Sequence, residues 1–397
     1  MNRVETAPLH LPDVSAAPPL ALYVHWPFCV SKCPYCDFNS HVRASVDQAA
    51  WRAALLTDLA YEASLLPGRK LGSIFFGGGT PSLMPPETVA AIIAAAADAW
   101  GFADDIEITL EANPSSVEAA RFATLALAGV NRVSLGLQAL DDAALKFLGR
   151  AHDVREGLAA LETAQKAFGR VSFDLIYARP EQSLDAWDAE LARAISFGTE
   201  HLSLYQLTIE PGTRFATEAA AGRLHIPGED LGADLFEVTR SMTDAAGLPA
   251  YEISNHARPG AESRHNLSYW RYSDYAGIGP GAHGRRGGMA TVRHKKPENW
   301  LSAIDRNGQG IELTTKLSPG DRLTEAMLMG MRLREGLDLS RHFDTENPGL
   351  TQSLNQRALV TLEAQGLIAR DGTRLRATDR GLPVLNAILS SLLTDPA

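Results

Sequence analysis

The sequence predicts an α/β protein in which a parallel sheet is followed by a smaller, mainly helical region. Two alternating series of segments support this fold class. Apolar, β-prone runs lie at 20–25, 73–76, 106–111, 132–138, 171–177 and 201–208. Ala-rich segments with helical spacing lie between and after them, at 47–66, 86–100, 115–127, 153–168, 184–197 and 229–246. Strand alternating with helix predicts βαβ units and a parallel sheet. Six such units make an open sheet or a partial (β/α)6 TIM-like barrel.

Composition and charge fit a globular protein and argue against nucleic-acid binding. Apolar residues make up 45% of the 397 residues, and 37 basic residues stand against 47 acidic ones. The net charge of −10 has the wrong sign for a phosphate-backbone binder, so we expect no nucleic-acid partner. Residues 1–18 lack the apolar core of a secretory signal and predict a loose tail. The longest uncharged stretches, such as 88–97 and 381–394, are shorter than the roughly 20 residues of a membrane span. We therefore expect a soluble, cytoplasmic protein.

The periodic pattern changes after residue 250, which suggests further domain boundaries. We assign 19–250 to the barrel, 251–310 to a connecting segment rich in Tyr, His, Gly and Asn, and 311–397 to a helical domain. Within this last domain, 319–336 and 351–367 have helical spacing. Residues 368–377 predict a hairpin with a type I′ turn centred on Asp371-Gly372. Helix, hairpin and helix predict a winged-helix-like appendage, which we interpret as a structural cap because few basic residues accompany the hairpin.

Polar residues gather where the predicted strands end, which is where α/β proteins bind ligands. A glycine turn at 77–81 ends the second strand, and its glycines allow a ligand to approach the backbone closely. Glu111 ends the third strand, Gln138 ends the fourth, and Asp174 lies within the fifth. These positions predict a binding site at the carboxyl edge of the sheet.

The three cysteines of the chain lie within eight residues, directly after the first predicted strand. Cys29, Cys33 and Cys36 have the spacing C-x3-C-x2-C, which is unlike a secreted disulfide framework. Three thiolates on one loop can cap three corners of a [4Fe–4S] cluster and leave the fourth iron open to another ligand. A structural zinc ion is an alternative, with His25 or His41 as its fourth ligand. A redox pair at Cys33 and Cys36 is a further alternative, which leaves Cys29 unused.

This cysteine spacing after a first strand, with an aromatic residue before the last cysteine, resembles the signature of the radical SAM superfamily. The resemblance implies that Cys29, Cys33 and Cys36 ligate the cluster and that the open iron binds the amino and carboxylate groups of S-adenosylmethionine. It also implies that an electron from the cluster can cleave the sulfonium to give a 5′-deoxyadenosyl radical. The positions that match cofactor contacts are Tyr23, Gly78, Gly79, Thr80, Glu111, Gln138, Arg150 and Asp174.

Over residues 20–390 the chain resembles the oxygen-independent coproporphyrinogen III oxidase group. The likeness rests on the segments Tyr-Val-His-Trp-Pro-Phe-Cys, Phe-Gly-Gly-Gly-Thr-Pro-Ser, Glu-Ala-Asn-Pro, Leu-Gly-Arg-Ala-His and Phe-Asp-Leu-Ile-Tyr. That group includes a dehydrogenase, which oxidatively decarboxylates two propionates of coproporphyrinogen III, and haem chaperones, which pass haem to acceptor proteins. Ala178-Arg179-Pro180 stands where the group has Gly-Leu-Pro, and Ala139 replaces a serine, so the shapes of these loops stay open.

Two features favour the chaperones of this group. The dehydrogenase has a further cysteine where this chain has Phe38, and a longer segment before its first strand. His265, Tyr269 and Trp270 match the H-N-x-x-Y-W motif of the chaperones, which is implicated there in haem binding. An imidazole can ligate haem iron, and the two aromatic side chains offer flat faces to a porphyrin. His283 is a candidate second ligand.

The resemblance thus implies a haem chaperone that carries a [4Fe–4S] cluster, exchangeable S-adenosylmethionine and haem. The expected partners are acceptor haemoproteins, with respiratory, membrane-associated proteins among the candidates. A homodimer is one candidate oligomeric state. One alternative is coproporphyrinogen III dehydrogenase, a radical SAM enzyme of haem biosynthesis. The other is a zinc-binding winged-helix regulator, against which the acidic charge and the missing fourth zinc ligand both count. The number of bound S-adenosylmethionine molecules and radical cleavage itself stay open.

Overall fold

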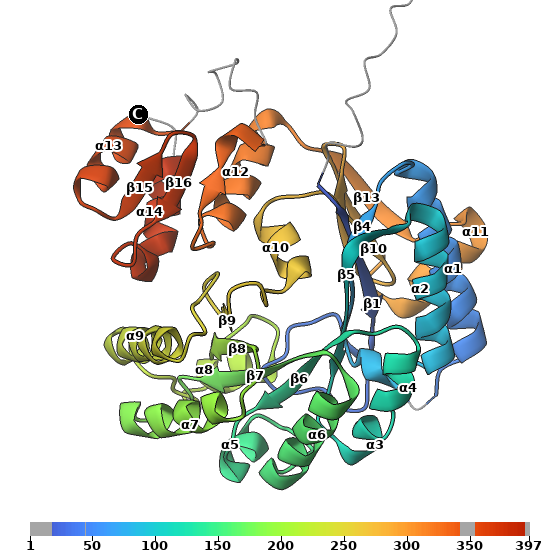
Figure 1. Ribbon diagram of the computed structural model, residues 1–397, viewed down its shortest axis with the longest axis horizontal. Coiled ribbons are helices and arrows are strands. Elements are labelled where there is room, and N and C mark those ends of the chain that lie inside the picture. The colour runs from blue at the N-terminus through green and yellow to red at the C-terminus, as the bar shows by residue number, and fades with distance from the viewer. Residues whose placement is uncertain (1–17, 44, 342–353, 394–397) are drawn as a thin grey trace, which may run out of the picture.

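The computed structural model describes residues 18–43, 45–341 and 354–393, so nearly all of the tail expected over 1–18 lies outside the described residues. Its main feature is one sheet of eleven strands in the order β13-β12-β11-β10-β1-β4-β5-β6-β7-β8-β9 (Figure 1). Six neighbouring strands run parallel: β1 (Leu20–Trp26), β4 (Leu71–Gly78), β5 (Phe102–Ala112), β6 (Arg132–Gln138), β7 (Arg170–Tyr177) and β8 (His201–Gln206). These are the six β-prone runs of the sequence, and they confirm the α/β class.

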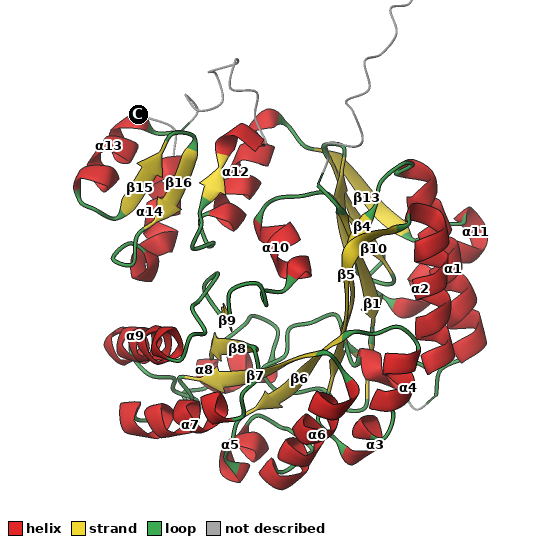
Figure 2. Cartoon of the chain, viewed as in Figure 1, coloured by secondary structure: helices red, strands yellow, loops and turns green. Residues whose placement is uncertain are grey.

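The sheet is curved, and its two faces have different surroundings. Figure 2 shows most helices along the outer side of the curve and the short helix α10 (Arg264–Trp270) on the inner side. The outer helices are α1 (Gln48–Leu65), α2 (Pro86–Trp100), α3 (Ser116–Ala119), α4 (Phe122–Leu127), α5 (Asp142–Phe147), α6 (Val154–Ala167), α7 (Leu184–Ser196), α8 (Arg214–Ala220) and α9 (Glu229–Ala245). This arrangement is the partial barrel that the sequence predicts.

Several outer helices begin at side chains that cap their first turn. The Asp47 carboxylate accepts hydrogen bonds from the backbone N–H groups of Ala49 and Ala50 at the start of α1. Asp153 caps α6, and the Ser183 hydroxyl caps α7 in the same way. Each such cap satisfies a backbone donor that the helix itself cannot pair.

Among the described helices, none is both long enough and apolar enough to cross a bilayer.

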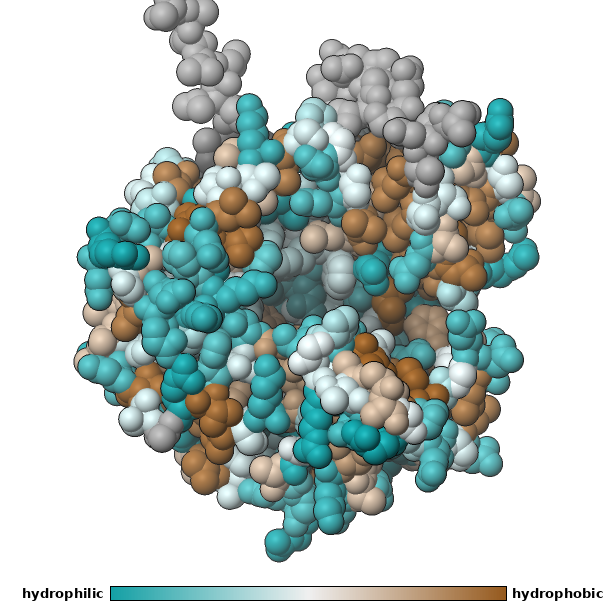
Figure 3. Space-filling view, turned by 180° about the vertical axis from the view of Figure 1, so that it is seen from behind, coloured by the Kyte–Doolittle hydropathy of each residue, from teal (hydrophilic) through white to brown (hydrophobic). Residues whose placement is uncertain are grey.

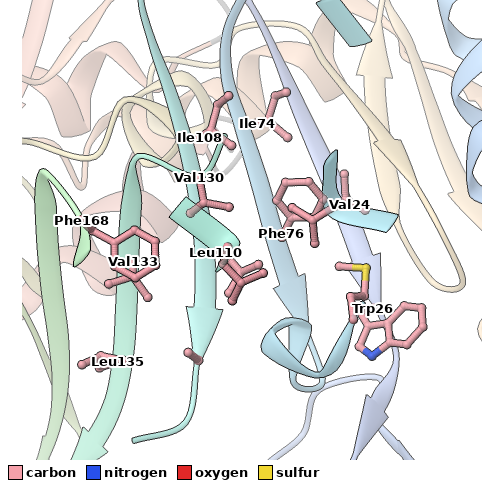
Figure 4. Packing of buried hydrophobic residues seen from close by; sticks show 14 of the residues in the cluster. Val24, Trp26, Ile74, Phe76, Ile108, Leu110, Val130, Val133, Leu135 and Phe168 are labelled. Atoms are coloured by element: carbon pink, nitrogen blue, oxygen red, sulfur yellow. The ribbon is translucent and has the colours of Figure 1, made fainter. Parts of the chain in front are cut away.

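The main hydrophobic core lies between the sheet and the outer helices (Figure 4). Alternate strand residues such as Val24, Ile74, Ile108 and Val133 point into it and are fully or almost fully buried. Because successive side chains of a strand point to opposite faces, the intervening residues face the inside of the curve. Those residues are mostly polar: Tyr23, His25, Ser73, Glu107, Thr109, Glu111, Arg132, Ser134, Ser172, Asp174, His201, Ser203 and Tyr205. The parallel strands therefore have an apolar outer face and a polar inner face.

The segment 251–310, which shows no clear period in the sequence, contains regular elements. It holds β9 (Asn255–Ala257), α10, β10 (Tyr275–Ile278), β11 (His283–Arg286), β12 (Met289–Arg293) and α11 (Pro297–Asn307), and β13 (Ile311–Lys316) follows directly. β10 pairs in parallel with β1, and β11 to β13 continue the sheet in antiparallel order. Strands of three to five residues are too short to show a clear alternation in the sequence. The division into domains stays a prediction, but these strands and the barrel share one sheet.

A buried ion pair ties this extension of the sheet to α1. The Arg293 guanidinium on β12 donates to the carboxylates of Asp58 (2.6 Å) and Glu62 (2.9 Å), and all three side chains are buried. The indole Nε1–H of Trp300 also donates to Asp58, at 3.2 Å. The backbone N–H groups of Gly279 and Gly310 donate to Asp58 as well, which offsets part of the cost of burying these charges. Arg293 Nη1 has no partner among the described residues.

The C-terminal region has its own small core and a three-stranded sheet. Its elements are α12 (Pro319–Gly330), β14 (Leu337–Asp338), α13 (Gln356–Ala364), β15 (Ile368–Asp371), β16 (Arg374–Ala377) and α14 (Leu385–Leu393). Of the helix predicted at 351–367, residues 351–353 lie outside the described ranges. The hairpin is present, but its turn is shifted by one residue, since Asp371 pairs with Arg374 and the loop is Gly372-Thr373. Only the first loop residue, Gly372, has a positive φ (+57°), which fits a type II′ turn rather than the predicted type I′.

Candidate functional site

The cysteine loop begins at the carboxyl end of β1. β2 (Phe28–Cys29) pairs with β3 (His41–Val42), which closes the loop at its base. The three cysteines are free and half-buried, and burial raises the pKa of Cys29 and of Cys36. A hydroxyl and a guanidinium approach the sulfur atoms: Thr80 Oγ1 lies 3.5 Å from Cys29 Sγ, and Arg150 Nη1 lies 3.4 Å from Cys33 Sγ. These donors are suited to stabilise thiolates.

The cysteines do not converge on one point. No set of three or more His, Cys, Asp or Glu side chains in the described part of the chain is placed to hold a metal ion together. In a [4Fe–4S] cube, each thiolate ligates a different iron, so a cluster does not require the three sulfur atoms to meet at one ion. The arrangement can therefore serve a cluster on the loop.

The glycine turn after β4 packs directly against the start of the cysteine loop. Gly78 has a φ of +112°, and a Cβ there would lie 2.6 Å from the ring of His25. A Cβ on Gly79 would lie 2.7 Å from the carbonyl oxygen of Phe28. The N–H of Thr80 donates to that same carbonyl at 2.8 Å. These contacts require the predicted glycines for local packing, whatever ligand the turn also binds.

Glu111 lies inside the barrel beside the glycine turn. Its Oε2 accepts a hydrogen bond from the Gly78 N–H at 3.3 Å. Burial, and secondarily the charge of Asp174, raise the pKa of Glu111 to about 8. Burial also raises the pKa of Asp174, to about 6, against the hydrogen bonds from Ser203 and Ser134. The structure thus brings β4, β5 and β7 together around Glu111 and Asp174, whose carboxyl groups interact electrostatically.

Arg150 connects the cysteine loop with the ends of β5 and β6. Its Nη2 donates to Asn113 Oδ1 at 2.6 Å and to the Gly136 carbonyl at 2.9 Å. Asn113 in turn donates through Nδ2 to Thr80 Oγ1, at 3.2 Å. Sequence reasoning left Asn113 without a role, although it lies in the Glu-Ala-Asn-Pro segment two residues after Glu111. Its place beyond a strand end is the signal that could have identified it.

Two polar atoms of this group lack partners. The Arg150 Nε–H and the Gln138 Oε1 are buried and form no hydrogen bond within the described ranges. Gln138 also has a φ of +70°, an uncommon conformation for a non-glycine residue, which can mark a functional position. Buried polar atoms are normally paired, so these two are suited to a polar ligand.

His265, Tyr269 and Trp270 all lie on α10, inside the curve of the sheet. The His265 Nδ1 lies 3.0 Å from the Ser73 hydroxyl, and its ring stacks on Phe75 with centroids 4.8 Å apart. The Tyr269 ring also packs against the imidazole, with centroids 5.0 Å apart and the planes tilted. Only 4% of His265 is exposed, and burial lowers its pKa to about 3. The imidazole is therefore neutral at neutral pH, while Trp270 is half-buried at the end of the helix.

The two sites predicted separately from the sequence are connected through Tyr23. The Tyr23 hydroxyl lies 3.0 Å from His25 Nδ1, on the cysteine-loop side. The Tyr23 ring also lies 6.2 Å from that of His265. Figure 3 shows a recess at the centre of the molecule with hydrophilic residues in its depth, consistent with a polar inner face of the barrel. The structure thus places the motif helix α10 and the expected cofactor residues on one interior surface.

Glu107 holds the beginning of α10, and sequence reasoning missed it. Its carboxylate accepts from the Ser263 hydroxyl and from the backbone N–H groups of Arg264 and His265, at 3.2–3.3 Å. Arg170 pairs with it at 2.7 Å. The charges of Arg132 and Arg170, together with the backbone hydrogen bonds, lower the pKa of Glu107 despite its burial. Glu107 is an inward-facing residue of β5, so the period-2 pattern of that strand is the signal that could have pointed to it.

Two family models match separate parts of the chain. The model of the radical SAM superfamily matches residues 23–193, which include the cysteine loop and the strand ends around it. The model of the HemN C-terminal domain matches residues 317–384.

Several curated relatives match almost the whole chain. The Radical S-adenosyl methionine domain-containing protein 1, mitochondrial, of Bos taurus is 41% identical over 94% of this chain and 87% of that protein. The Heme chaperone HemW of Escherichia coli (strain K12) is 36% identical over 95% of this chain and 99% of that protein. The Heme chaperone HemW of Haemophilus influenzae is 37% identical, with the same two shares covered.

A solved structure shares the fold. It is the coproporphyrinogen III oxidase HemN from Escherichia coli, described as a radical SAM enzyme, which superposes with a TM-score of 0.78. The superposition covers 94% of this chain and 90% of that one, at 22% sequence identity. At this identity the likeness establishes the fold alone.

Proposed function

Since this chain belongs to the HemW family of radical SAM proteins, we propose that it is a haem chaperone, which binds haem and transfers it to acceptor haemoproteins. Relatives with the name Heme chaperone HemW support the proposal because they align over nearly their full length. The alternative of a coproporphyrinogen III dehydrogenase has the HemN structure in its favour, but that likeness concerns the fold.

One observation carries the proposal: the His265 Nε2 is buried and has no hydrogen-bond partner in the part of the chain that the structure describes. The other ring nitrogen, Nδ1, lies at hydrogen-bond distance from Ser73. If Nδ1–H donates to this hydroxyl, Nε2 carries a free lone pair. A neutral imidazole whose second nitrogen is hydrogen-bonded is a typical ligand of haem iron.

The burial of His265 has a consequence for haem entry. The His265 Nε2 is itself buried among its neighbours, so iron can reach it only when side chains around the imidazole or α10 move. Tyr269 is half-buried, and its ring lies against that of Tyr275, with centroids 4.2 Å apart. In the proposed function, the flat faces of Tyr269 and Trp270 then contact the porphyrin.

The proposal includes a [4Fe–4S] cluster on Cys29, Cys33 and Cys36 and S-adenosylmethionine beside it. The donors at the sulfur atoms and the unpaired atoms of Arg150 and Gln138 support this assignment. When bound, the cluster and S-adenosylmethionine together supply one-electron chemistry. The residues proposed to hold S-adenosylmethionine are Tyr23, Gly78, Gly79, Thr80, Glu111, Gln138, Arg150 and Asp174.

These side chains have distinct proposed tasks. Arg150 is suited to bind the carboxylate of the methionine part, since a guanidinium can pair bidentately with it. Glu111 and Asp174 are suited to accept hydrogen bonds from hydroxyl groups. With a pKa of about 8, Glu111 also holds a proton at neutral pH, whereas Asp174, with a pKa of about 6, is mostly ionised there. Acceptor haemoproteins as partners, a homodimer and a cytoplasmic location remain predictions of the same proposal.

The proposal is tested by titrating haem into anaerobically purified, cluster-reconstituted protein and recording the haem spectrum. We expect binding of about one haem per chain, because the motif occurs once. The His265→Ala variant should lose binding or show a changed haem spectrum while it keeps its iron–sulfur absorption. His225→Ala is the matched control, since His225 is exposed and lies outside α10.

A parallel assay separates the chaperone from the dehydrogenase. Reduced protein is incubated anaerobically with coproporphyrinogen III and S-adenosylmethionine, and porphyrins are separated by chromatography. We expect no protoporphyrinogen. Formation of protoporphyrinogen without haem binding would reverse the assignment in favour of the dehydrogenase.

A further inference from the structure

Four arginines surround a small cavity between α9 and the C-terminal region. Arg240 lies on α9, Arg332 and Arg334 follow α12, and Arg376 lies on β16. The cavity has a volume of about 130 Å³. A water molecule occupies about 30 Å³ in the liquid, so the space is sufficient for a carboxylate group with a few waters. We call it the arginine pocket.

The positive charge of the arginine pocket is only partly compensated. Arg240 pairs with Asp379 at 3.4 Å, but that aspartate side chain is 90% exposed, and such pairs are weak. Arg334 pairs with Asp244 at 3.3 Å, again on the surface. Arg332 and Arg376 form no ion pair with any described residue.

An acidic residue in the wall of the arginine pocket does not neutralise these cations. Glu252 is buried, and its Oε1 accepts from the backbone N–H of Ser254 and from the Asn255 amide. It forms no ion pair with a pocket arginine among the described residues, and burial raises its pKa. The arginine pocket therefore carries a net positive charge that is available to an anion.

The arginine pocket adjoins the motif helix α10. The Arg332 guanidinium lies over the Trp270 ring, 6.0 Å from its centroid. Glu252 acts electrostatically on Tyr205, which faces the interior beside Asp174. The pocket thus lies where the inside of the barrel meets the C-terminal region.

We propose that the arginine pocket binds the propionate carboxylates of haem, while Trp270 contacts the porphyrin ring. Haem is a flat apolar ring with two carboxylates on one edge, and the site offers an aromatic face next to Arg332, which like Arg376 forms no ion pair with any described residue. Guanidinium groups match carboxylates in geometry and remain charged when partly buried. This inference rests on the proposed haem-chaperone function and adds the residues that recognise the charged edge of the ligand.

The test compares haem with its propionate dimethyl ester, which lacks both negative charges. Dissociation constants for the two are measured on the full cluster-reconstituted chain, for the wild type and for Arg332→Gln/Arg376→Gln. Arg357→Gln/Arg380→Gln is the matched control, because both arginines are exposed in the same region and lie outside the arginine pocket. Circular dichroism and iron content verify that each variant is folded.

We expect the wild type and the control to bind haem about tenfold more tightly than the ester, and the pocket variant to lose this preference. Equal preference for haem in all three proteins would overturn the pocket assignment and leave the chaperone function intact. An equal weakening of haem and ester binding in the pocket variant would also overturn it, since the arginines would then act only on structure. If the wild type bound neither compound, the chaperone function and the pocket assignment would fail together.

Discussion

At the scale of single residues, the glycine turn after β4 shows how closely the site is packed. Gly78 and Gly101 both have positive φ values, +112° and +67°, so alanine is strained at either position. Only at Gly78 does a Cβ also meet another group, the His25 ring at 2.6 Å, whereas the space around Gly101 is open. We expect Gly78→Ala to lower the free energy of unfolding by about 1–3 kcal/mol more than Gly101→Ala. Urea unfolding of the two variants measures the difference. Equal losses of unfolding free energy would show that the His25 ring moves aside without a loss of stability.

The cysteines give a second prediction at this scale. Replacing Cys29, Cys33 or Cys36 by Ser should abolish stable cluster binding in each case, because the chain has only these three thiols. Reconstituted wild-type protein should contain about four irons per chain. Ser31→Ala, an exposed change on the same loop, should keep its iron. Tightly bound zinc in place of iron in the wild type would instead support the alternative of a structural zinc ion.

At the scale of elements, the position of α10 depends on a buried carboxylate in β5. Glu107 accepts hydrogen bonds from the first turn of α10 and pairs with Arg170. Glu107→Gln keeps the size of the side chain but removes its charge. It also places an amide NH2 group, which is a donor, among the N–H groups that donate to Glu107. Breaking one partner of a buried pair costs about 3–5 kcal/mol, so we expect a loss of this order in unfolding free energy. Hydrogen exchange of the α10 amides should also become faster.

Glu200 provides the control for this prediction. It is the second carboxylate partner of Arg170, at 2.9 Å, but it is partly exposed and, within the described residues, forms no hydrogen bond with α10, in contrast to Glu107. Glu200→Gln should therefore cost less than about 1 kcal/mol and leave exchange in α10 unchanged. Similar effects of both substitutions would indicate that Arg170, rather than the Glu107 carboxylate, holds the helix.

At the scale of the whole molecule, the polar interior makes stability depend on pH. Glu111 and Asp174 have raised pKa values, about 8 and about 6, in the folded protein without ligands. An acid whose pKa is raised by folding binds its proton more tightly in the folded state. Its stabilising contribution to the free energy of unfolding is present at low pH and is lost as the pH rises through the pKa of the group in the folded state. At pH 8 we expect the free energy of unfolding of Glu111→Gln to exceed that of the wild type, by a few kcal/mol at most. Near pH 4.5 we expect no such excess. Urea titrations at the two pH values measure this, and a constant difference would contradict the assigned pKa.

Much of the fold follows from local patterns in the sequence. The six parallel strands appear as apolar runs because each is buried on its outer face, as Val24 in β1 and Ile108 in β5 illustrate. Helical spacing and capping residues such as Asp47 are likewise visible within a few residues of sequence. The turn of the C-terminal hairpin was misplaced by one residue, because Asp371-Gly372 and Gly372-Thr373 are both acceptable turn sequences and strand pairing selects between them.

The sequence by itself determined the α/β class, the cysteine loop and the family, since strand and helix periods, ligand spacing and motifs are all local. Only the tertiary structure decided which of these parts meet. Ser73 and His265, 192 residues apart, are hydrogen-bonded across the barrel interior, and β10 joins the sheet beside β1. Arg332 reaches Trp270 from a different region of the chain. Such contacts depend on long-range pairing of strands and on how the sheet curves, and they leave no periodic pattern in the residues that form them.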